Sequence, residues 1–220
     1  MHIATSKQEA MNLGFGNYTC NWGTHMCGLY ETPHERDEII LGFLHQGDQE
    51  KDLQLYCPVE RPPEDFCSAY QREYPACAGH VHDPQRFRLL GARELYYPDG
   101  RFSPRSMDRG LAEFYEDSQR QGKRNIRATA EMVWALDAIP GVEHLMVYES
   151  RLNYFIPGKP WMSICLYNLT RFSGATIMKV LQTHPFAISG GVITANPYYQ
   201  DPDDWLKANA PDFQGQVERG

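Results

Sequence analysis

His25 and Cys27, near the start of the sequence, have the types and the spacing of metal ligands. They stand two residues apart in an apolar, strand-like segment, so both side chains are expected on the same face of the strand. Imidazole and thiolate are both good ligands for zinc or iron. A packed cysteine beside a hydrogen-bonded histidine fits the same pattern, so the pair is either a ligand site or part of the core.

A second group of metal-ligand residue types, Cys67, Cys77, His80 and His82, lies in an irregular segment. Four such ligands could close a tetrahedral zinc site and hold together a loop that has little core of its own. Their spacing matches no standard zinc finger. Surface histidines and a cysteine buried in a helix are the alternative.

Cys27 and Cys165 are the candidate nucleophiles of a cysteine-dependent enzyme. Both lie in apolar strands, where a thiol is usually buried and inert. The sequence contains no Gly-x-Ser-x-Gly elbow and no zinc-protease or kinase signature. These observations favour a protein that is not an enzyme.

The elements that must position these residues alternate between strand-like and helix-like segments, which predicts a mostly parallel sheet with helices on both faces, a three-layer αβα fold. Strands are expected at 25–30, 53–57, 87–90, 94–97, 125–131 and 162–167 and from 186 onward. Helices are expected over 33–47, 64–74, 103–121, 142–155 and 174–183. We expect a single domain, 1–220, with its core at about 25–199 and a loosely attached polar tail over 200–220 that holds one short helix around Trp205.

Ligands of open α/β sheets bind outside the carboxyl ends of the strands. Tyr30, Glu31 and Tyr167 are expected at those ends, together with Glu131 and the nearby Trp134. The sequence therefore predicts a ligand pocket of aromatic side chains and a few acids there. Glu131 as a helix-capping carboxylate and Trp134 as a core residue are the alternative.

Glu149 and Arg151 belong to one predicted helix but cannot share a face, because positions i and i+2 of a helix point apart. We expect one of them to face the pocket and the other to make surface contacts.

The turn after the first predicted strand, residues 30–33, has no glycine and no lysine, and Glu31 would repel phosphate. Nucleotide-hydrolysing proteins of this architecture need a glycine-rich loop with a lysine at that point. The sequence therefore predicts a sheet without a working phosphate loop.

Composition excludes some classes of protein. The net charge of −7 over 220 residues argues against direct nucleic-acid binding. No apolar run is long enough to span a membrane, and the first residues do not resemble a secretory signal. We therefore expect a cytoplasmic protein whose six cysteines are reduced.

Seven short segments together resemble one known family, the MEDS domain (methanogen/methylotroph DcmR sensory domain). In chain order they are His25–Glu31, Tyr97–Phe102, Ala130–Leu136, Tyr148–Asn153, Ile164–Tyr167, Thr183–Pro185 and Asn196–Tyr199. The first segment matches the family's opening His-x-Cys-x-x-[Phe/Tyr] motif. The resemblance spans about residues 25–199.

The resemblance implies a ligand-sensing module of prokaryotic signal transduction or transcription control that detects small hydrocarbon derivatives. It also implies a degenerate relative of RecA/KaiC-type P-loop domains. Such modules are usually joined to a histidine kinase or a DNA-binding region, for which this sequence has no room. We therefore expect the signal to pass to a signalling partner protein or through a homodimer.

Three functions stay open: a sensor of a small organic molecule with or without a metal, an enzyme that depends on a metal or on Cys27, and a pure protein-interaction module.

Overall fold

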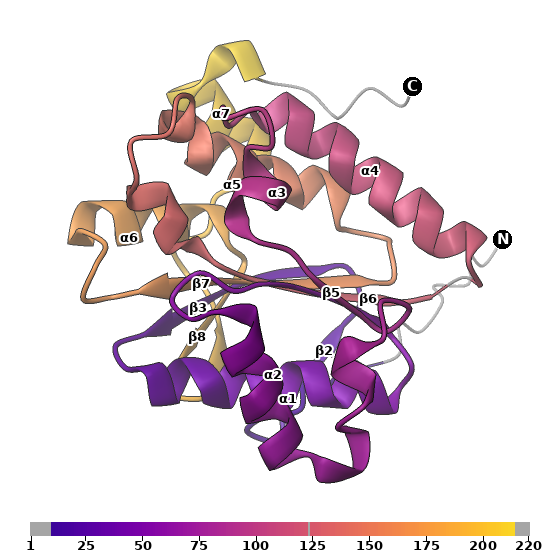
Figure 1. Ribbon diagram of the computed structural model, residues 1–220. Coiled ribbons are helices and arrows are strands. Elements are labelled where there is room, and N and C mark those ends of the chain that lie inside the picture. The colour runs from indigo at the N-terminus through magenta and orange to yellow at the C-terminus, as the bar shows by residue number, and fades with distance from the viewer. Residues whose placement is uncertain (1–9, 123, 214–220) are drawn as a thin grey trace, which may run out of the picture.

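The computed structural model describes residues 10–122 and 124–213, and its centre is one sheet between two layers of helices (Figure 1). Across the sheet the strands are β5 (Phe87–Leu89), β4 (Leu53–Cys57), β6 (Ile126–Glu131), β7 (Trp161–Asn168), β3 (Thr24–Tyr30), β8 (Phe186–Ser189) and β9 (Val192–Ala195). Neighbouring strands are parallel except β8 and β9, which form an antiparallel pair. The mostly parallel three-layer fold predicted from the sequence is confirmed.

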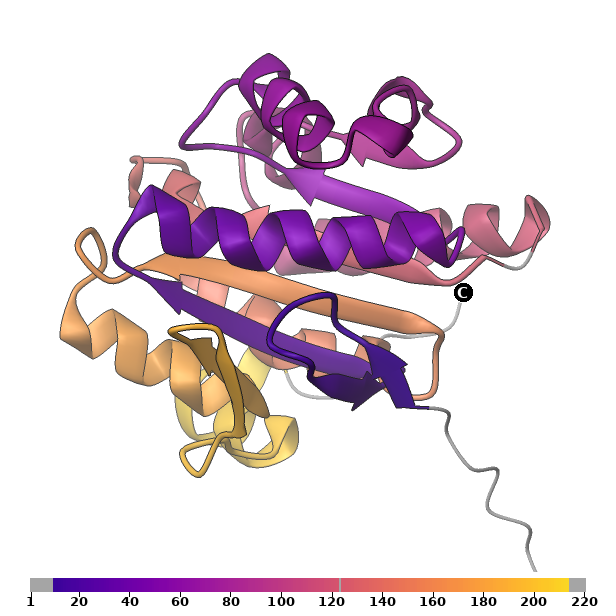
Figure 2. The same ribbon diagram turned by 90° about the horizontal axis from the view of Figure 1, so that it is seen from below.

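Two helices cover one face of the sheet, α1 (Pro33–Gln49) and α2 (Pro63–Glu73) (Figures 1 and 2). The other face carries α3 (Ala92–Tyr96), α4 (Pro104–Arg120), α5 (Leu145–Phe155), α6 (Gly174–Thr183) and α7 (Pro202–Asn209). Short 3₁₀ turns connect them at Pro75–Cys77, His80–His82, Met132–Leu136, Val142–His144 and Pro211–Phe213. Each face of the sheet has its own apolar core.

The turn from β3 into α1 shows why no phosphate loop forms there. Thr32 caps the helix, and Pro33 occupies its first position. The carboxylate of Glu35 accepts hydrogen bonds from the amides of Glu31 at 2.7 Å and Thr32 at 3.2 Å. In a phosphate-binding turn such amides point outward and bind an anion. Here the carboxylate of Glu35 binds them instead.

Two predictions about local structure are wrong. Residues 94–97 are not a strand, because Ala92–Tyr96 form α3, whose Tyr96 ring stacks on Trp134 with centroids 4.5 Å apart. The tail after residue 200 is not loosely attached, because Trp205 of α7 is 3% exposed and Leu206 is fully buried. Residues 214–220 of that predicted tail lie outside the described residues.

A hairpin before the predicted core was not anticipated. It consists of β1 (Ala10–Asn12) and β2 (Thr19–Asn21), which pair only with each other. Gly14 in its turn has a φ of +86°, and its backbone meets Gly42 of α1 so closely that neither position has room for a side chain. The buried guanidinium of Arg127 donates to the carbonyl of Asn12 at 2.8 Å. The hairpin is thereby fixed to the end of the sheet.

Across residues 10–122 and 124–213, no helix has both the length and the apolar character needed to cross a membrane.

Candidate functional site

Four metal-ligand side chains meet in the interior, and each comes from a different element. His25 lies on β3, Cys165 on β7 and Glu149 on α5. His184 is the residue that directly follows α6. Each residue is at most 5% exposed. One ligand atom from each of the four lies within 4.8 Å of the other three.

The fold brings the four together for simple reasons. β3 and β7 are parallel neighbours, and their register sets His25 and Cys165 two positions apart on the face that α5 covers. His184 stands just before β8, the strand on the other side of β3, so its side chain meets the same point. Glu149 comes from α5, every residue of which is buried from 145 to 152.

The Oε2 atom of Glu149 is the centre of this cluster. It lies 3.2 Å from Nε2 of His25, 3.4 Å from Nε2 of His184 and 3.5 Å from Sγ of Cys165. The Cys165 sulfur is also 3.5 Å from Nε2 of His25. The nitrogen–oxygen separation of 3.2 Å lies at the upper end of the usual hydrogen-bond range of about 2.7–3.2 Å, and the separation of 3.4 Å lies beyond it.

The other ring nitrogen of each histidine has a partner that fixes its proton. Nδ1 of His184 lies 2.7 Å from the carbonyl oxygen of Val180, which can only accept. Nδ1 of His25 lies 3.3 Å from Oδ1 of Asn153, whose amide nitrogen donates to the carbonyl of Thr183 at 2.8 Å. Both Nδ1 atoms are therefore donors, and in the neutral rings each Nε2 presents a lone pair to the cluster.

The cluster places the carboxylate of Glu149 against two imidazoles in the interior. Burial lowers the pKa of His25 to about 4, so this imidazole is neutral at neutral pH. The hydroxyl of Tyr167 donates to Glu149 Oε1 at 2.7 Å.

Cys27 points to the same face of the sheet as His25, as expected, but is not one of the four clustered ligands. It is fully buried, and its thiol lies 3.6 Å from the carbonyl of Phe186. Burial, with the charge of Glu149, raises the pKa of Cys27 to about 12. Burial also raises the pKa of Cys165 well above its usual range. Both are poor nucleophiles as protonated thiols, which argues against a cysteine-dependent enzyme.

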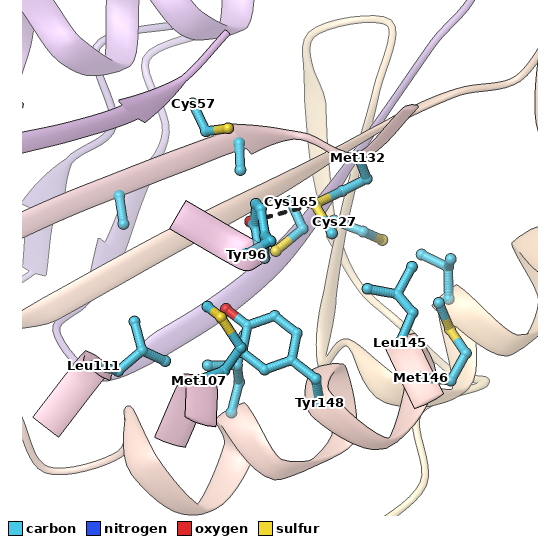
Figure 3. Close-up of a cluster of buried hydrophobic side chains, with 14 of the residues drawn as sticks. Cys27, Cys57, Tyr96, Met107, Leu111, Met132, Leu145, Met146, Tyr148 and Cys165 are labelled. Carbon is cyan, nitrogen blue, oxygen red and sulfur yellow. Dashed lines mark hydrogen bonds between the residues drawn. The ribbon is translucent and has the colours of Figure 1, made fainter. Parts of the chain in front are cut away.

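A small apolar cavity adjoins the cluster, and Cys165 lines it. The cavity has a volume of about 30 Å³ and lies between the strands β4, β6 and β7 and the helices that cover them. Its apolar lining includes Ala130, Met107 and Leu111, with the rings of Tyr96 and Tyr148. Figure 3 shows Cys165 beside Tyr96, whose hydroxyl donates to Met132 Sδ at 3.6 Å.

The carboxyl ends of the strands differ from the predicted pocket, because the protein's own side chains bind one another there. Glu131 is fully buried, accepts the hydroxyl hydrogen of Tyr56 and accepts the amide of Val59 at 2.9 Å. Tyr30 donates to Glu60 at 2.5 Å. Glu131 and Tyr30 therefore have partners inside the protein and support the fold at this edge.

Three further predicted ligand residues lie away from the four-residue cluster. Glu31 is exposed at the turn before α1. Trp134 is 1% exposed and packs in the core against Tyr96. Arg151 forms an ion pair with Asp108 at 2.7 Å, so Glu149 alone of the two helix residues faces the site. The surface contacts expected for the other residue are not found, because Arg151 and Asp108 are both buried.

The predicted group of Cys67, Cys77, His80 and His82 is not assembled. Cys77 and His80 instead gather with Asp48, and within the described residues Cys67 and His82 belong to no such cluster. His82 lies 2.9 Å from the amide of Gln71, and Cys67 is buried in α2, as the alternative interpretation expects.

Sequence reasoning did not place His184 or Cys165 among the ligand residues. His184-Pro185 stands directly before a strand, and Cys165 lies in an apolar strand; both belong to segments that resemble the family's motifs. Membership of these family-like segments was the one signal in the sequence that could have identified the two residues. Whether their side chains lie close together depends on the strand order, which the sequence does not show.

Comparisons with known proteins agree with this fold. The family described as MEDS, the methanogen/methylotroph DcmR sensory domain, matches residues 24–185. The transcriptional repressor DcmR of Methylorubrum extorquens is 22% identical over 161 residues, which are 73% of this chain and 57% of the repressor. The chain thus matches little more than half the length of that relative.

Two solved structures share the fold at low sequence identity. A KaiC-like protein from Pyrococcus horikoshii has a TM-score of 0.55 and 11% identity, with 81% of this chain and 79% of that one covered. The flagellar accessory protein FlaH from Methanocaldococcus jannaschii has a TM-score of 0.54 and 12% identity, with 82% and 83% covered. The RecA-like fold expected from the sequence is confirmed.

Proposed function

Because the chain belongs to the MEDS family of sensory domains, we propose that it senses a small, apolar organic molecule in the cavity beside Cys165. The observation that carries this proposal is the position of that cavity. It lies inside the domain, its lining is largely apolar, and one lining residue also belongs to the buried polar cluster. A molecule bound there would contact both the sheet and the helices above it.

The size of the cavity restricts the ligand. An engineered protein cavity of about 150 Å³ binds benzene, whereas this cavity has a volume of about 30 Å³. The domain can therefore take a molecule of only a few non-hydrogen atoms without moving its side chains. This limit agrees with the small hydrocarbon derivatives that the family resemblance implies.

Such a ligand binds weakly. Even the best small ligands gain at most about 1.5 kcal/mol per non-hydrogen atom, so three atoms correspond to a dissociation constant near a millimolar at best. A sensor of this kind responds to an abundant compound. Binding must therefore be tested at ligand concentrations well above a millimolar.

A wider hollow of about 420 Å³ between α5 and residues 209–213 is a less suitable place for this ligand. The charged side chains of Glu143 and Lys179 line it, with His144 nearby. An apolar molecule gains little from replacing water around charged groups. A substitution in this hollow nevertheless serves as the matched control for a binding experiment.

The output of the sensor belongs to the same proposal. The relative is named as a transcriptional repressor, so a change in this domain would be passed to a regulatory partner protein or to a second copy of the chain. The negative net charge gives no support for direct contact with nucleic acid.

The test is a thermal-unfolding series with neutral molecules of one to four carbon atoms, such as short alcohols, ketones and alkyl halides. At least one should raise the unfolding temperature with a concentration dependence that follows mass action. Ala130→Leu, which fills the cavity from β6, should abolish the ligand-induced rise, and Lys179→Ala should leave it unchanged. A rise that survives Ala130→Leu and is lost in Lys179→Ala would place the ligand in the wider hollow. No rise with any compound would leave a pure interaction module as the better description.

A further inference from the structure

We propose that His25, His184, Glu149 and Cys165 form a closed tetrahedral site for a divalent transition-metal ion, and that zinc is the ion they fit best. The site is distinct from the apolar cavity that the proposed function uses, although the two share Cys165. This site differs from both metal sites that the sequence suggests. Neither the His25–Cys27 pair nor the group that includes His80 and His82 forms a cluster of ligand atoms in the structure.

The first argument is electrostatic. Both histidines donate through Nδ1, to Val180 and to Asn153, so each ring in its neutral form turns an Nε2 lone pair inward. Glu149 adds a carboxylate oxygen to the same point. Lone pairs that converge at a buried point repel one another unless a cation lies between them.

The second argument is an unpaired atom. Nε2 of His184 is buried and forms no hydrogen bond with any described residue. The His184 side chain is fully buried, and its Nε2 points toward Oε2 of Glu149 at 3.4 Å. Buried polar atoms nearly always have a hydrogen-bond partner, and a metal ion at this point would bind the lone pair of this nitrogen.

The third argument is geometric. Metal bonds of about 2.0–2.3 Å to nitrogen, oxygen and sulfur place neighbouring ligand atoms of a zinc tetrahedron roughly 3.3–3.8 Å apart. The separations around Glu149 Oε2 are 3.2 Å to His25, 3.4 Å to His184 and 3.5 Å to Cys165. The two nitrogen–oxygen separations are thus at or beyond the upper limit of good hydrogen bonds, and all three separations are close to the spacing of a tetrahedral site.

The surroundings match those of known metal ligands. Metal-bound histidines usually donate the other ring nitrogen to a carbonyl or carboxylate, and ligating carboxylates accept a further hydrogen bond. Here His184 donates to a backbone carbonyl, His25 to an amide oxygen, and Glu149 accepts the hydroxyl hydrogen of Tyr167. These contacts hold three of the four ligand side chains in position before an ion binds.

Charge and ligand type favour zinc. When the ion binds, the thiol proton of Cys165 passes to solvent, and one thiolate with one carboxylate balances a charge of two in the buried site. Two imidazoles, a thiolate and a carboxylate in a tetrahedron suit zinc better than copper, which prefers a planar arrangement, or magnesium, which prefers oxygen ligands. All four positions are filled by protein, as in structural zinc sites.

The other metal-ligand cluster of the described residues does not pass the same test. Asp48, Cys77 and His80 gather near the end of α1. Nη1 of Arg86 lies 2.8 Å from Asp48 and 3.2 Å from Nδ1 of His80, so a guanidinium already supplies the positive charge. The buried cluster around Glu149 has no such group, because its ion-pair partners among the described residues are the two histidines.

Cobalt(II) substitution of the full-length chain, purified under reducing conditions, tests the site. The wild-type protein should bind one cobalt ion with the intense visible absorption of tetrahedral coordination and a thiolate-to-cobalt charge-transfer band in the near ultraviolet. Zinc should displace it with one-to-one stoichiometry. Cys165→Ser should remove the charge-transfer band, and His184→Ala should lower the affinity by at least about 100-fold.

Cys27→Ser is the matched control, because Cys27 is as buried as Cys165, lies opposite it on the neighbouring strand and should leave the spectrum unchanged. If wild-type protein binds no stoichiometric cobalt or zinc, or if Cys165→Ser keeps the charge-transfer band, the cluster holds only a proton and the proposal is wrong. If Cys165→Ser does not fold, the wild-type spectrum tests the proposal by itself. Its charge-transfer band must then correspond to one thiolate ligand per cobalt ion. Ala130→Leu separates this proposal from the sensing function, because it should abolish organic-ligand binding and keep the cobalt spectrum.

Discussion

Tyr167 of β7 donates its hydroxyl hydrogen to Oε1 of Glu149 at 2.7 Å and so links the central sheet to α5. Both residues are fully buried. The hydrogen bond fixes one carboxylate oxygen and leaves Oε2 to face His25, His184 and Cys165. Tyr167 thus determines which oxygen of Glu149 the proposed metal would meet.

Tyr167→Phe should weaken zinc binding by roughly 10–100-fold, because hydrogen bonds to a ligating carboxylate hold it in the geometry that the metal requires. Competition with a chromophoric chelator measures this change. Tyr154→Phe removes a comparable tyrosine-to-carboxylate hydrogen bond at the surface, to Asp203, and should leave the affinity unchanged. Equal affinities of wild-type protein and Tyr167→Phe would show that Glu149 needs no such support.

Gly42→Ala should destabilise the protein by about 1–3 kcal/mol, because a Cβ at position 42 would lie 2.4 Å from the carbonyl oxygen of Gly14 and force the hairpin away from α1. Gly110→Ala is the opposite case. Position 110 is exposed in α4 with nothing within 4 Å of a new Cβ, so alanine should stabilise the helix by about 0.5–1 kcal/mol. Urea unfolding of the two variants measures both effects, and a neutral Gly42→Ala would mean that the hairpin is free to move.

Local signals in the sequence were sufficient for most elements. Thr32-Pro33 and Ser103-Pro104 mark the starts of α1 and α4, and the apolar segment before Asn168 marks β7. They work because caps and hydrophobic periodicity act over a few residues. Residues 94–97 were misassigned because aromatic residues favour strands, whereas the contact of Tyr96 with Trp134, far along the chain, stabilises a helix.

The site itself could be predicted only in part. His25, Glu149 and Tyr167 were named from the sequence, but their common partner His184 was not. His184 reaches the site because β8 pairs with β3, and such long-range pairing leaves no local trace in the sequence. The carboxyl-end pocket expected from fold analogy was replaced by contacts of Glu60 with Tyr30 and with Asn168, since Glu60 lies in a loop whose path no pattern specifies.

Trp205→Ala should destabilise the protein by about 3–5 kcal/mol, because the indole of α7 is 3% exposed and packs in the core that covers the sheet. Its ring nitrogen also donates to Gln182 of α6 at 3.2 Å. Lys207→Ala, on the exposed side of the same helix, should change the free energy of unfolding by less than about 0.5 kcal/mol. If the two variants unfold alike, the packing of Trp205 contributes nothing measurable to stability.

The stability contributed by Asp48 should be lost in acid. Burial raises the pKa of this carboxyl, but hydrogen bonds from His80 and Arg86, both 2.8 Å away, outweigh burial and hold the pKa below its ordinary value of 3.8. A carboxyl whose pKa is lower in the folded state than in the unfolded chain stabilises the fold fully above the unfolded value. That contribution is lost as the pH falls through the folded value.

Asp48→Asn should therefore reduce the free energy of unfolding by about 1–2 kcal/mol near neutral pH, with the partial exposure of both partners limiting the effect. The gap between wild-type protein and variant should narrow below the ordinary pKa of 3.8, where the wild-type carboxyl also becomes neutral. Urea unfolding across a pH series measures the gap, and Asp137→Asn at an exposed position should show none at any pH. A gap that stays constant through the acid range would mean that the shape of Asp48, and not its charge, holds the end of α1 to His80 and Arg86.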